Sequence, residues 1–145
     1  MISFFKENTD FDIKSKNKIK TWLRSVAAGY GCTIGDLNYI FCDAEYLLDI
    51  NKQYLGHDYY TDIITFDSRE DTSSRRIDGD IFISVDTVRA NGDEYGEGFD
   101  REIMRVVAHG LLHLVGEDDV TEALQKKMRA AENAALEKWD TIMMS

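Results

Sequence analysis

Hydrophobic and polar positions repeat with two periods along this chain, and the period of two marks the strands. Aromatic and aliphatic side chains in residues 1–8 predict a short edge strand. In residues 36–43 apolar side chains recur at every second position, which places them on one face of a strand. Residues 61–67 are rich in β-branched side chains, and residues 79–86 follow a polar turn, so both segments are also predicted to be strands.

The helical period of three to four residues marks the remaining elements. Five segments are predicted to be helical: residues 14–31, 44–56, about 84–96, 100–116 and 121–139. The helix over 100–116 is the most apolar of them, which implies that it is buried. Because strands and helices interleave, we expect an α+β fold of α/β-like order, with a small mixed sheet of about four strands and about five helices. No linker or repeat divides residues 1–145, so a single domain is expected.

Composition and charge narrow the class of protein. The chain is 43% hydrophobic and 30% charged, as in soluble globular proteins, and no apolar run approaches the roughly 20 residues of a membrane span. We see no secretion signal, and Cys32 and Cys42 are interpreted as reduced thiols, so a cytoplasmic protein without a membrane partner is expected. The net charge of −10 argues weakly against a general nucleic-acid binder, because phosphate would be repelled.

Two histidines on the most apolar helix are candidate metal ligands. His109 and His113 are four residues apart, so on a helix their rings lie on one face, one turn apart. Gly116 can adopt a positive φ that reverses the chain and returns Asp119 to the helix end. Three protein ligands would leave a fourth position for water or substrate, as in a catalytic zinc site. The sequence therefore predicts Zn²⁺ bound by His109, His113 and Asp119, on the most buried helix.

The alternative interpretation is a packed or hydrogen-bonded pair of core histidines. The glycine and the acidic residues that follow it favour the metal, because two buried polar rings need partners. Zinc proteases with this histidine spacing keep a glutamate directly after the first histidine, whereas this chain has Gly110, which argues against proteolysis. A residue without a side chain lets either a neighbouring strand or a substrate backbone approach the helix, and the sequence leaves both readings open.

Three segments resemble the motifs of the YbeY family of metallo-endoribonucleases. Residues 109–119 (HGLLHLVGEDD) resemble its signature HGxLHLxGYDH, residues 47–66 (LLDINKQYLGHDYYTDIITF) resemble LNxxYRxxDxPTDVLSF, and residues 78–84 (DGDIFIS) resemble xGDIxIS. The matching positions are Asn51, Tyr54, Asp58, Thr61, Asp62, Phe66, Gly79, Asp80, Ile81, Ile83, Ser84, His109, Gly110, Leu112, His113, Leu114, Gly116 and Asp118.

The resemblance implies a function in ribosome maturation. Members of the family are single-strand-specific, metal-dependent enzymes, so we expect a zinc endoribonuclease that acts in 16S rRNA 3′-end maturation and ribosome quality control. The implied partners are ribosomal RNA and the small ribosomal subunit. The oligomeric state is not predicted.

This sequence departs from the family pattern at two positions that matter for chemistry. Asp119 stands where the family has its third metal-binding histidine, so the site carries one more negative charge and the metal should be a weaker Lewis acid. Leu55 stands where the family has an arginine implicated in activity, so a cation that could bind phosphate is missing there. Glu117 replaces the tyrosine of the signature and adds a further negative charge.

The catalytic groups are less clearly indicated than the metal ligands. A metal-bound water is one possibility, with Asp118 as a candidate proton acceptor, and attack by the 2′-hydroxyl of the RNA is another. Thr61 and Asp62 fit either a family role or the start of a strand. Ser84 is more simply explained as a helix cap.

Binding of RNA by an acidic protein requires local positive charge. Residues 14–24 carry five basic residues and no acid, and Lys16, Lys20 and Arg24 form a stripe on the predicted helix. A solvated helix face is the simpler explanation of this stripe, since such charges also keep a surface soluble. A second group of candidate RNA contacts comprises Arg69, Arg75 and Arg76 in the turn between two strands.

Three functions are therefore carried forward. The first is a zinc-dependent endoribonuclease acting on ribosomal RNA. The second is a non-enzymatic ribosome-assembly factor stabilised by its metal, which Leu55 and Asp119 make credible. The third is a metal-dependent hydrolase of another substrate.

Overall fold

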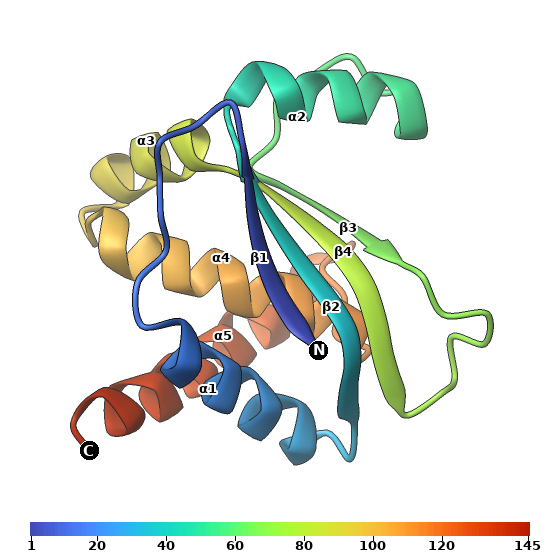
Figure 1. Cartoon of the computed structure of the whole chain (residues 1–145), viewed down its shortest axis with the longest axis vertical. Coiled ribbons are helices and arrows are strands. Elements are labelled where there is room, and N and C mark those ends of the chain that lie inside the picture. Colours follow the sequence, from blue (N-terminus) through green and yellow to red (C-terminus); the bar gives the residue numbers. More distant parts are fainter.

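A computed structural model describes residues 1–145 and contains one four-stranded sheet (Figure 1). Its strands are β1 (Ile2–Glu7), β2 (Thr33–Cys42), β3 (Ile63–Asp67) and β4 (Arg76–Ser84), in the order β1-β2-β4-β3. β1, β2 and β4 run parallel, and β3 pairs antiparallel with β4. The sheet is therefore mixed, and β1 is an edge strand, as predicted.

Five α-helices and one short π-helix complete the fold. They are α1 (Lys16–Gly29), α2 (Ala44–Ile50), the π-helix η1 (Asn51–Leu55), α3 (Val85–Tyr95), α4 (Phe99–Leu114) and α5 (Glu122–Met143). The side chains of Asp43, Ser84 and Thr121 cap α2, α3 and α5 by accepting a hydrogen bond from a backbone N–H three residues later. The α+β prediction is confirmed, and the helix cap is the observed role of Ser84.

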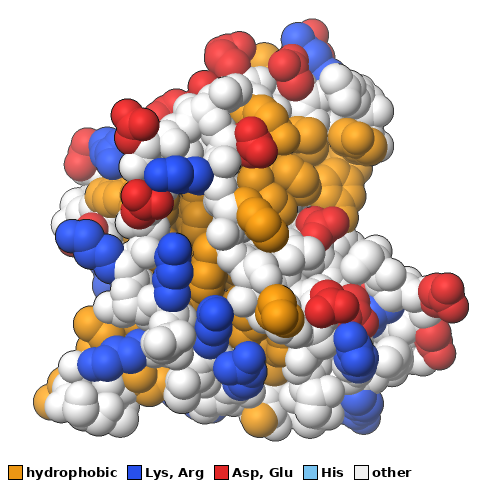
Figure 2. Space-filling model, in the orientation of Figure 1, with side chains coloured by type: hydrophobic (Ala, Val, Ile, Leu, Met, Phe, Trp, Pro, Cys, Tyr) orange, Lys and Arg blue, Asp and Glu red, His pale blue; other side chains and the backbone are white.

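The helices cover the two faces of the sheet unequally. α1, α3, α4 and α5 contribute to one large core on the face that carries Leu37, Tyr39 and Phe41, each at most 2% exposed. A smaller cluster around Cys42, Leu47 and Ile64 lies under α2 on the other face. Figure 2 shows this second face as an apolar hollow beneath α2. The buried position predicted for α4 is confirmed.

Gly110 brings α4 into direct contact with the sheet. A Cβ atom at this position would lie 2.9 Å from two side-chain atoms of Ile81 and 3.2 Å from Ile63. These distances are shorter than ordinary carbon contacts, so any larger residue at this position would require the Ile81 side chain or the helix to shift. The sequence left open whether a strand or a substrate approaches the helix at Gly110. The structure shows that strands β3 and β4 do so.

The predicted elements differ from the observed ones mainly at their ends. Residues 44–56 were predicted as one helix, but η1 continues α2 with wider turns before Gly56 (φ 66°) ends it. β2 begins at Thr33, three residues earlier than predicted, and α5 extends four residues further, to Met143. Both cysteines are free thiols. None of the helices is long and apolar enough to cross a membrane.

Candidate metal centre

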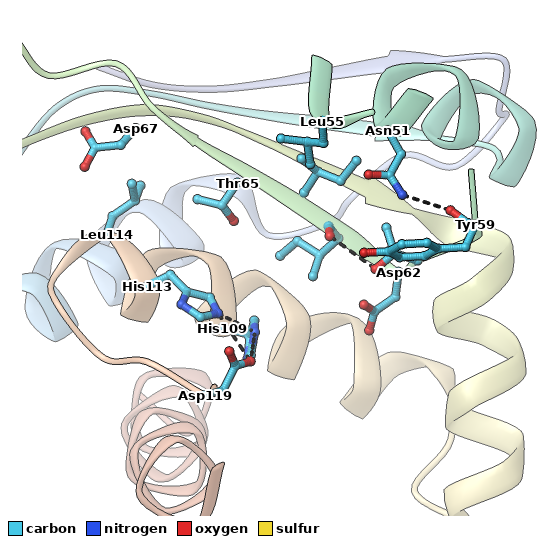
Figure 3. Close-up of a pocket in the computed structure, with 13 residues that line it drawn as sticks. Asn51, Leu55, Tyr59, Asp62, Thr65, Asp67, His109, His113, Leu114 and Asp119 are labelled. Atoms are coloured by element: carbon cyan, nitrogen blue, oxygen red, sulfur yellow. Dashed lines mark hydrogen bonds and ion pairs between the residues drawn. The ribbon is translucent and has the colours of Figure 1, made fainter. Parts of the chain in front are cut away.

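Three predicted ligands converge at the C-terminal end of α4 (Figure 3). The Nε2 atoms of His109 and His113 are 3.0 Å apart. The Asp119 Oδ2 atom lies 3.6 Å from His109 Nε2 and 3.5 Å from His113 Nε2. Zinc bound tetrahedrally at about 2.0–2.2 Å separates its ligand atoms by about 3.3–3.6 Å. The triangle formed by these three atoms has nearly this size, so the donor set fits one small divalent ion.

The second nitrogen of each histidine ring has its own partner, which leaves Nε2 free for a metal. His109 Nδ1 lies 2.8 Å from Glu132 Oε2, and His113 Nδ1 lies 3.1 Å from the backbone carbonyl oxygen of Glu117. In a neutral ring Nδ1–H then donates to these oxygens, and the lone pair of Nε2 points to the shared centre. Such outer hydrogen bonds typically orient histidine ligands in metal sites.

The turn after α4 positions the third ligand. Gly116 has a φ of 111°, a left-handed conformation that favours glycine. The backbone N–H of Glu117 donates to the carbonyl oxygen of Leu112, which closes the helix end. The chain thus reverses over the last turn of α4, and Asp119 returns to the histidines. This placement agrees with the prediction made from the glycine spacing.

Glu132 on α5 is a site residue that sequence reasoning missed. Glu132 is 6% exposed. Its Oε2 atom is hydrogen-bonded to His109, and its Oε1 atom lies 3.1 Å from Arg105 Nη1. Burial by itself would raise the pKa of Glu132, but the hydrogen bonds from His109 and Arg105 outweigh burial and lower it. A usable signal existed, because Glu132 is spaced four residues from Met128 and from Leu136 on the buried face of α5.

The charge around His109 favours its protonated form when no metal is bound. Burial opposes the charge and acts to lower the pKa, but the hydrogen bond to Glu132 and the negative charges of Glu132, Asp119 and Asp62 raise the pKa above its ordinary value. A divalent cation at Nε2 would meet the same negative surroundings. The site is therefore electrostatically suited to a cation.

A cavity of about 510 Å³ opens beside the ligands. α4 and the turn after it supply His109, His113, Leu114 and Asp119, and the facing wall is formed by η1, the loop after it and β3: Asn51, Leu55, Tyr59, Thr61, Asp62, Ile63, Ile64, Thr65 and Asp67. No lysine or arginine lines it. Leu55, where the family pattern has arginine, is one of the lining residues.

Asp62 and Asp118 differ in their relation to the cavity. Asp62 lines the cavity, and burial raises the pKa of its carboxyl group. Asp118 is exposed, does not line the cavity, and accepts a hydrogen bond from the backbone N–H of Asp119 at 2.7 Å. The structure thus brings Asp62, and not Asp118, into the same cavity as the histidine pair. Asp118 as a proton acceptor stays a prediction.

The three arginines predicted in the turn before β4 are engaged to different degrees, and Arg76 is in fact the first residue of that strand. The Arg69 side chain is only 7% exposed. Its guanidinium donates to Asp67 and to the carbonyl oxygens of Ser74 and Leu114. Arg75 is exposed and donates to the carbonyl oxygen of Tyr30, and Arg76 pairs with acidic side chains. Arg69 therefore joins the turn to the end of α4, and Arg75 is the freest of the three.

The basic stripe of α1 lies outside the cavity. Lys16 and Arg24 are exposed and Lys20 is half-buried, and none of the three has an acidic partner within 4.0 Å. Figure 2 shows basic side chains over the part of the surface where α1 lies.

The Glu117 side chain is turned away from the candidate metal ligands. It accepts a hydrogen bond from the Tyr30 hydroxyl at 2.9 Å and pairs with Lys127. Its negative charge is thus partly neutralised.

Taken together, the fold and the site define a class of protein: a small α+β protein that presents two histidines and a carboxylate to an open, polar cavity, as metal-dependent hydrolases do. The family model for Endoribonuclease YbeY matches residues 2–140, so the chain belongs to the YbeY family of endoribonucleases, enzymes that hydrolyse phosphodiester bonds.

Individual relatives agree with this assignment. The chain is 47% identical to Endoribonuclease YbeY of Phocaeicola vulgatus over 94% of its own length and 96% of that protein. It is 48% identical to Endoribonuclease YbeY of Cytophaga hutchinsonii over 93% of each chain. A solution structure of a Thermotoga maritima protein matches with a TM-score of 0.64 and 26% identity, covering 96% of this chain and 89% of that one.

Proposed function

We propose that this protein is a zinc-dependent endoribonuclease that cleaves single-stranded RNA, with Zn²⁺ held by His109, His113 and Asp119. The observation that carries the proposal is the triangle of two Nε2 atoms and one carboxylate oxygen, all within 3.6 Å of one another, beside an open cavity in a chain of an endoribonuclease family. Two imidazoles and one carboxylate suit zinc better than magnesium or calcium, which prefer oxygen ligands.

The metal ion, the groups that orient its ligands and the carboxylates nearby would have separate roles in the reaction. Bound zinc supplies Lewis acidity toward a phosphoryl oxygen and lowers the pKa of water. Glu132 and the Glu117 carbonyl oxygen hold the two rings with Nε2 toward the centre. Asp62, which lines the cavity, would take up a proton, and Asp118, which does not line it, is the second candidate proton acceptor.

The physiological substrate we propose is the precursor of 16S rRNA near its 3′ end, on the small ribosomal subunit in the cytoplasm. Residues 1–145 would act as one catalytic domain. Contacts to phosphates would come from outside the cavity, from Lys16, Lys20 and Arg24 on α1 and from Arg75 and Arg76, with Arg69 holding their turn in place. The location of these charges supports a long, rather than a compact, RNA footprint.

A second function is favoured by the lining of the cavity. Because Leu55 lines it and no lysine or arginine does, the site lacks a side chain that could neutralise a phosphate. The same fold, with the ion kept for stability, would then serve as a ribosome-assembly factor without nuclease activity. A hydrolase of another substrate has no such support, since the family is one of endoribonucleases.

One experiment separates these functions. Protein purified without an affinity tag is analysed for metal content and then incubated with a single-stranded RNA and the matching duplex. We expect about one zinc per chain, cleavage of the single strand, and loss of both in His113→Ala with the fold retained in circular dichroism. Zinc without cleavage would support the assembly factor, and no metal after zinc supplementation would overturn the site.

The choice of carboxylate is tested by a matched pair. Asp119→Ala should weaken zinc binding by more than about 100-fold, because a direct ligand should cost more than an outer hydrogen bond does. Asp118→Ala, one residue away and exposed, should leave zinc affinity almost unchanged. Equal losses in a competition titration would mean that the wrong carboxylate has been assigned.

A further inference from the structure

The loop between η1 and β3 carries aromatic side chains at the edge of the cavity. Tyr59 and Tyr60 are exposed by 55% and 57%, respectively. Only Tyr59 lines the cavity with the metal ligands, and Figure 3 shows its ring next to Asp62, on the other side of the cavity from His113. Tyr60 instead donates its hydroxyl to Glu45. The two neighbouring tyrosines therefore have different surroundings at equal exposure.

The position of the Tyr59 ring is held by three contacts. The ring stacks on His57 with centroids 5.2 Å apart and an angle of 19° between planes, and its hydroxyl lies 3.0 Å from His57 Nδ1. The backbone carbonyl of Tyr59 accepts a hydrogen bond from Asn51, which is 1% exposed. One face of the ring is thus covered by His57, while the residue stays 55% exposed and is one of those that line the cavity.

An exposed aromatic ring beside a site for RNA can serve as a stacking surface for a base. Because no lysine or arginine lines the cavity, the protein's own side chains there must bind a nucleotide by interactions other than ion pairing with phosphate. Base–aromatic stacking adds affinity for each base and tolerates every sequence, since each base has a π-face.

We propose that Tyr59, backed by His57, is a stacking platform for one unpaired nucleobase next to the phosphate to be cleaved. This proposal rests on the proposed function, because it takes the ligand of the cavity to be RNA. A base within a duplex is stacked on its neighbours and cannot lie on Tyr59 without being unpaired. The platform therefore favours single-stranded RNA and accepts any of the four bases.

The test compares the two neighbouring tyrosines in the full-length protein. Binding of a fluorescently labelled single-stranded RNA is followed by anisotropy, in zinc-loaded and in metal-free protein. Tyr59→Ala should weaken binding about tenfold, the change that corresponds to about 1.4 kcal/mol, with no change in the salt dependence, because no charge is removed. Tyr59→Trp should bind at least as well as the native protein. Tyr60→Ala is the matched control and should bind like the native protein.

A modified RNA makes the assignment specific to stacking. The modified strand lacks one base near the cleaved phosphate. The native protein should bind this strand about tenfold more weakly than the intact strand. Tyr59→Ala should bind the two strands equally well. Equal binding by Tyr59→Ala and Tyr60→Ala, or an equal effect of the missing base on native protein and Tyr59→Ala, would overturn the platform. Failure of the proposed nuclease is seen separately, as absence of cleavage by native protein that still binds the strand.

Discussion

The two walls of the cavity are built in different ways. The helical wall, α4 with α5, holds its polar groups by buried partners: Glu132 lies between Arg105 and His109, each through a short hydrogen bond. The facing wall, from η1 to the start of β3, is more exposed, with Leu55 and Tyr59 exposed by 44% and 55%. The first wall holds the candidate metal ligands in place, whereas the second presents exposed side chains to the cavity.

The comparison explains where this chain departs from its family pattern. Leu55 lies on the exposed wall, where a change of side chain leaves the core untouched. Asp119 follows the turn after α4, where a carboxylate reaches the centre as an imidazole would. His109 and His113, whose rings are held by Glu132 and by the backbone, keep the family residue. We infer that the two histidine positions on α4 tolerate substitution least.

Among the changes that compare the two walls, the largest effect is expected from the buried partner of His109 on the helical wall. Glu132→Ala should lower zinc affinity by about 10–100-fold, the usual cost of losing an outer hydrogen bond to a histidine ligand. The physical reason is that His109 would no longer be held with Nε2 toward the ion. Competition with a chromophoric chelator measures the loss.

The control for this prediction is Glu102→Gln. Glu102 is also buried and lies near Arg105, but it makes no hydrogen bond to His109. Equal losses in the two variants would show that general damage to the buried charges, and not the orientation of His109, lowers the affinity.

A gain of activity is expected from the exposed wall. Leu55→Arg introduces a guanidinium into the cavity lining and should raise kcat/KM for RNA cleavage about tenfold, because a charge-assisted hydrogen bond to a phosphate contributes about 1–3 kcal/mol. Steady-state cleavage of a labelled single strand measures it. Leu55→Met is the uncharged control, and a similar gain in that variant would argue against phosphate binding as the cause.

The smallest effect concerns Asp62, where the two walls meet. Burial raises the pKa of the Asp62 carboxyl group above the ordinary aspartate value of about 3.9. At a pH between these two values, Asp62 is protonated in the folded protein but has lost its proton in the unfolded chain. Stability therefore falls as pH rises through this window. Asp62→Asn removes this loss and should raise the Tm of metal-free protein at neutral pH, but not at strongly acidic pH.

Asp118→Asn serves as the control in the same thermal scans. Asp118 is exposed, and we expect the substitution to leave the Tm unchanged at both pH values. A Tm of Asp62→Asn that stays at the native value at neutral pH would mean that the charge of Asp62 is not costly in the folded state.

The strands and the histidine site were predictable because both depend on short-range spacing. Alternation predicted the buried face of β2, and the four-residue interval of His109 and His113, with the Gly116 turn, predicted how Asp119 meets them. These features need only the geometry of one helix or strand. The resemblance to family motifs then supplied the activity.

The remaining features depend on contacts between elements distant in the sequence. Glu132 reaches His109 across 23 positions of the chain, and Arg69 was predicted to bind RNA but mainly holds Asp67 and the end of α4. The π-helical continuation of α2 has no periodic signal over five residues. Each of these is decided by tertiary packing, which no local pattern contains.

The contact between Gly110 and Ile81 also limits how this enzyme class can evolve. Zinc proteases use the residue directly after the first histidine as their general base, and in this fold that residue faces the sheet at 2.9 Å. A glutamate introduced at position 110 would have to displace the Ile81 side chain or the helix before it could reach a substrate. Two hydrolase lineages can thus share a histidine spacing while the packing of the helix on the sheet obstructs the change from one to the other.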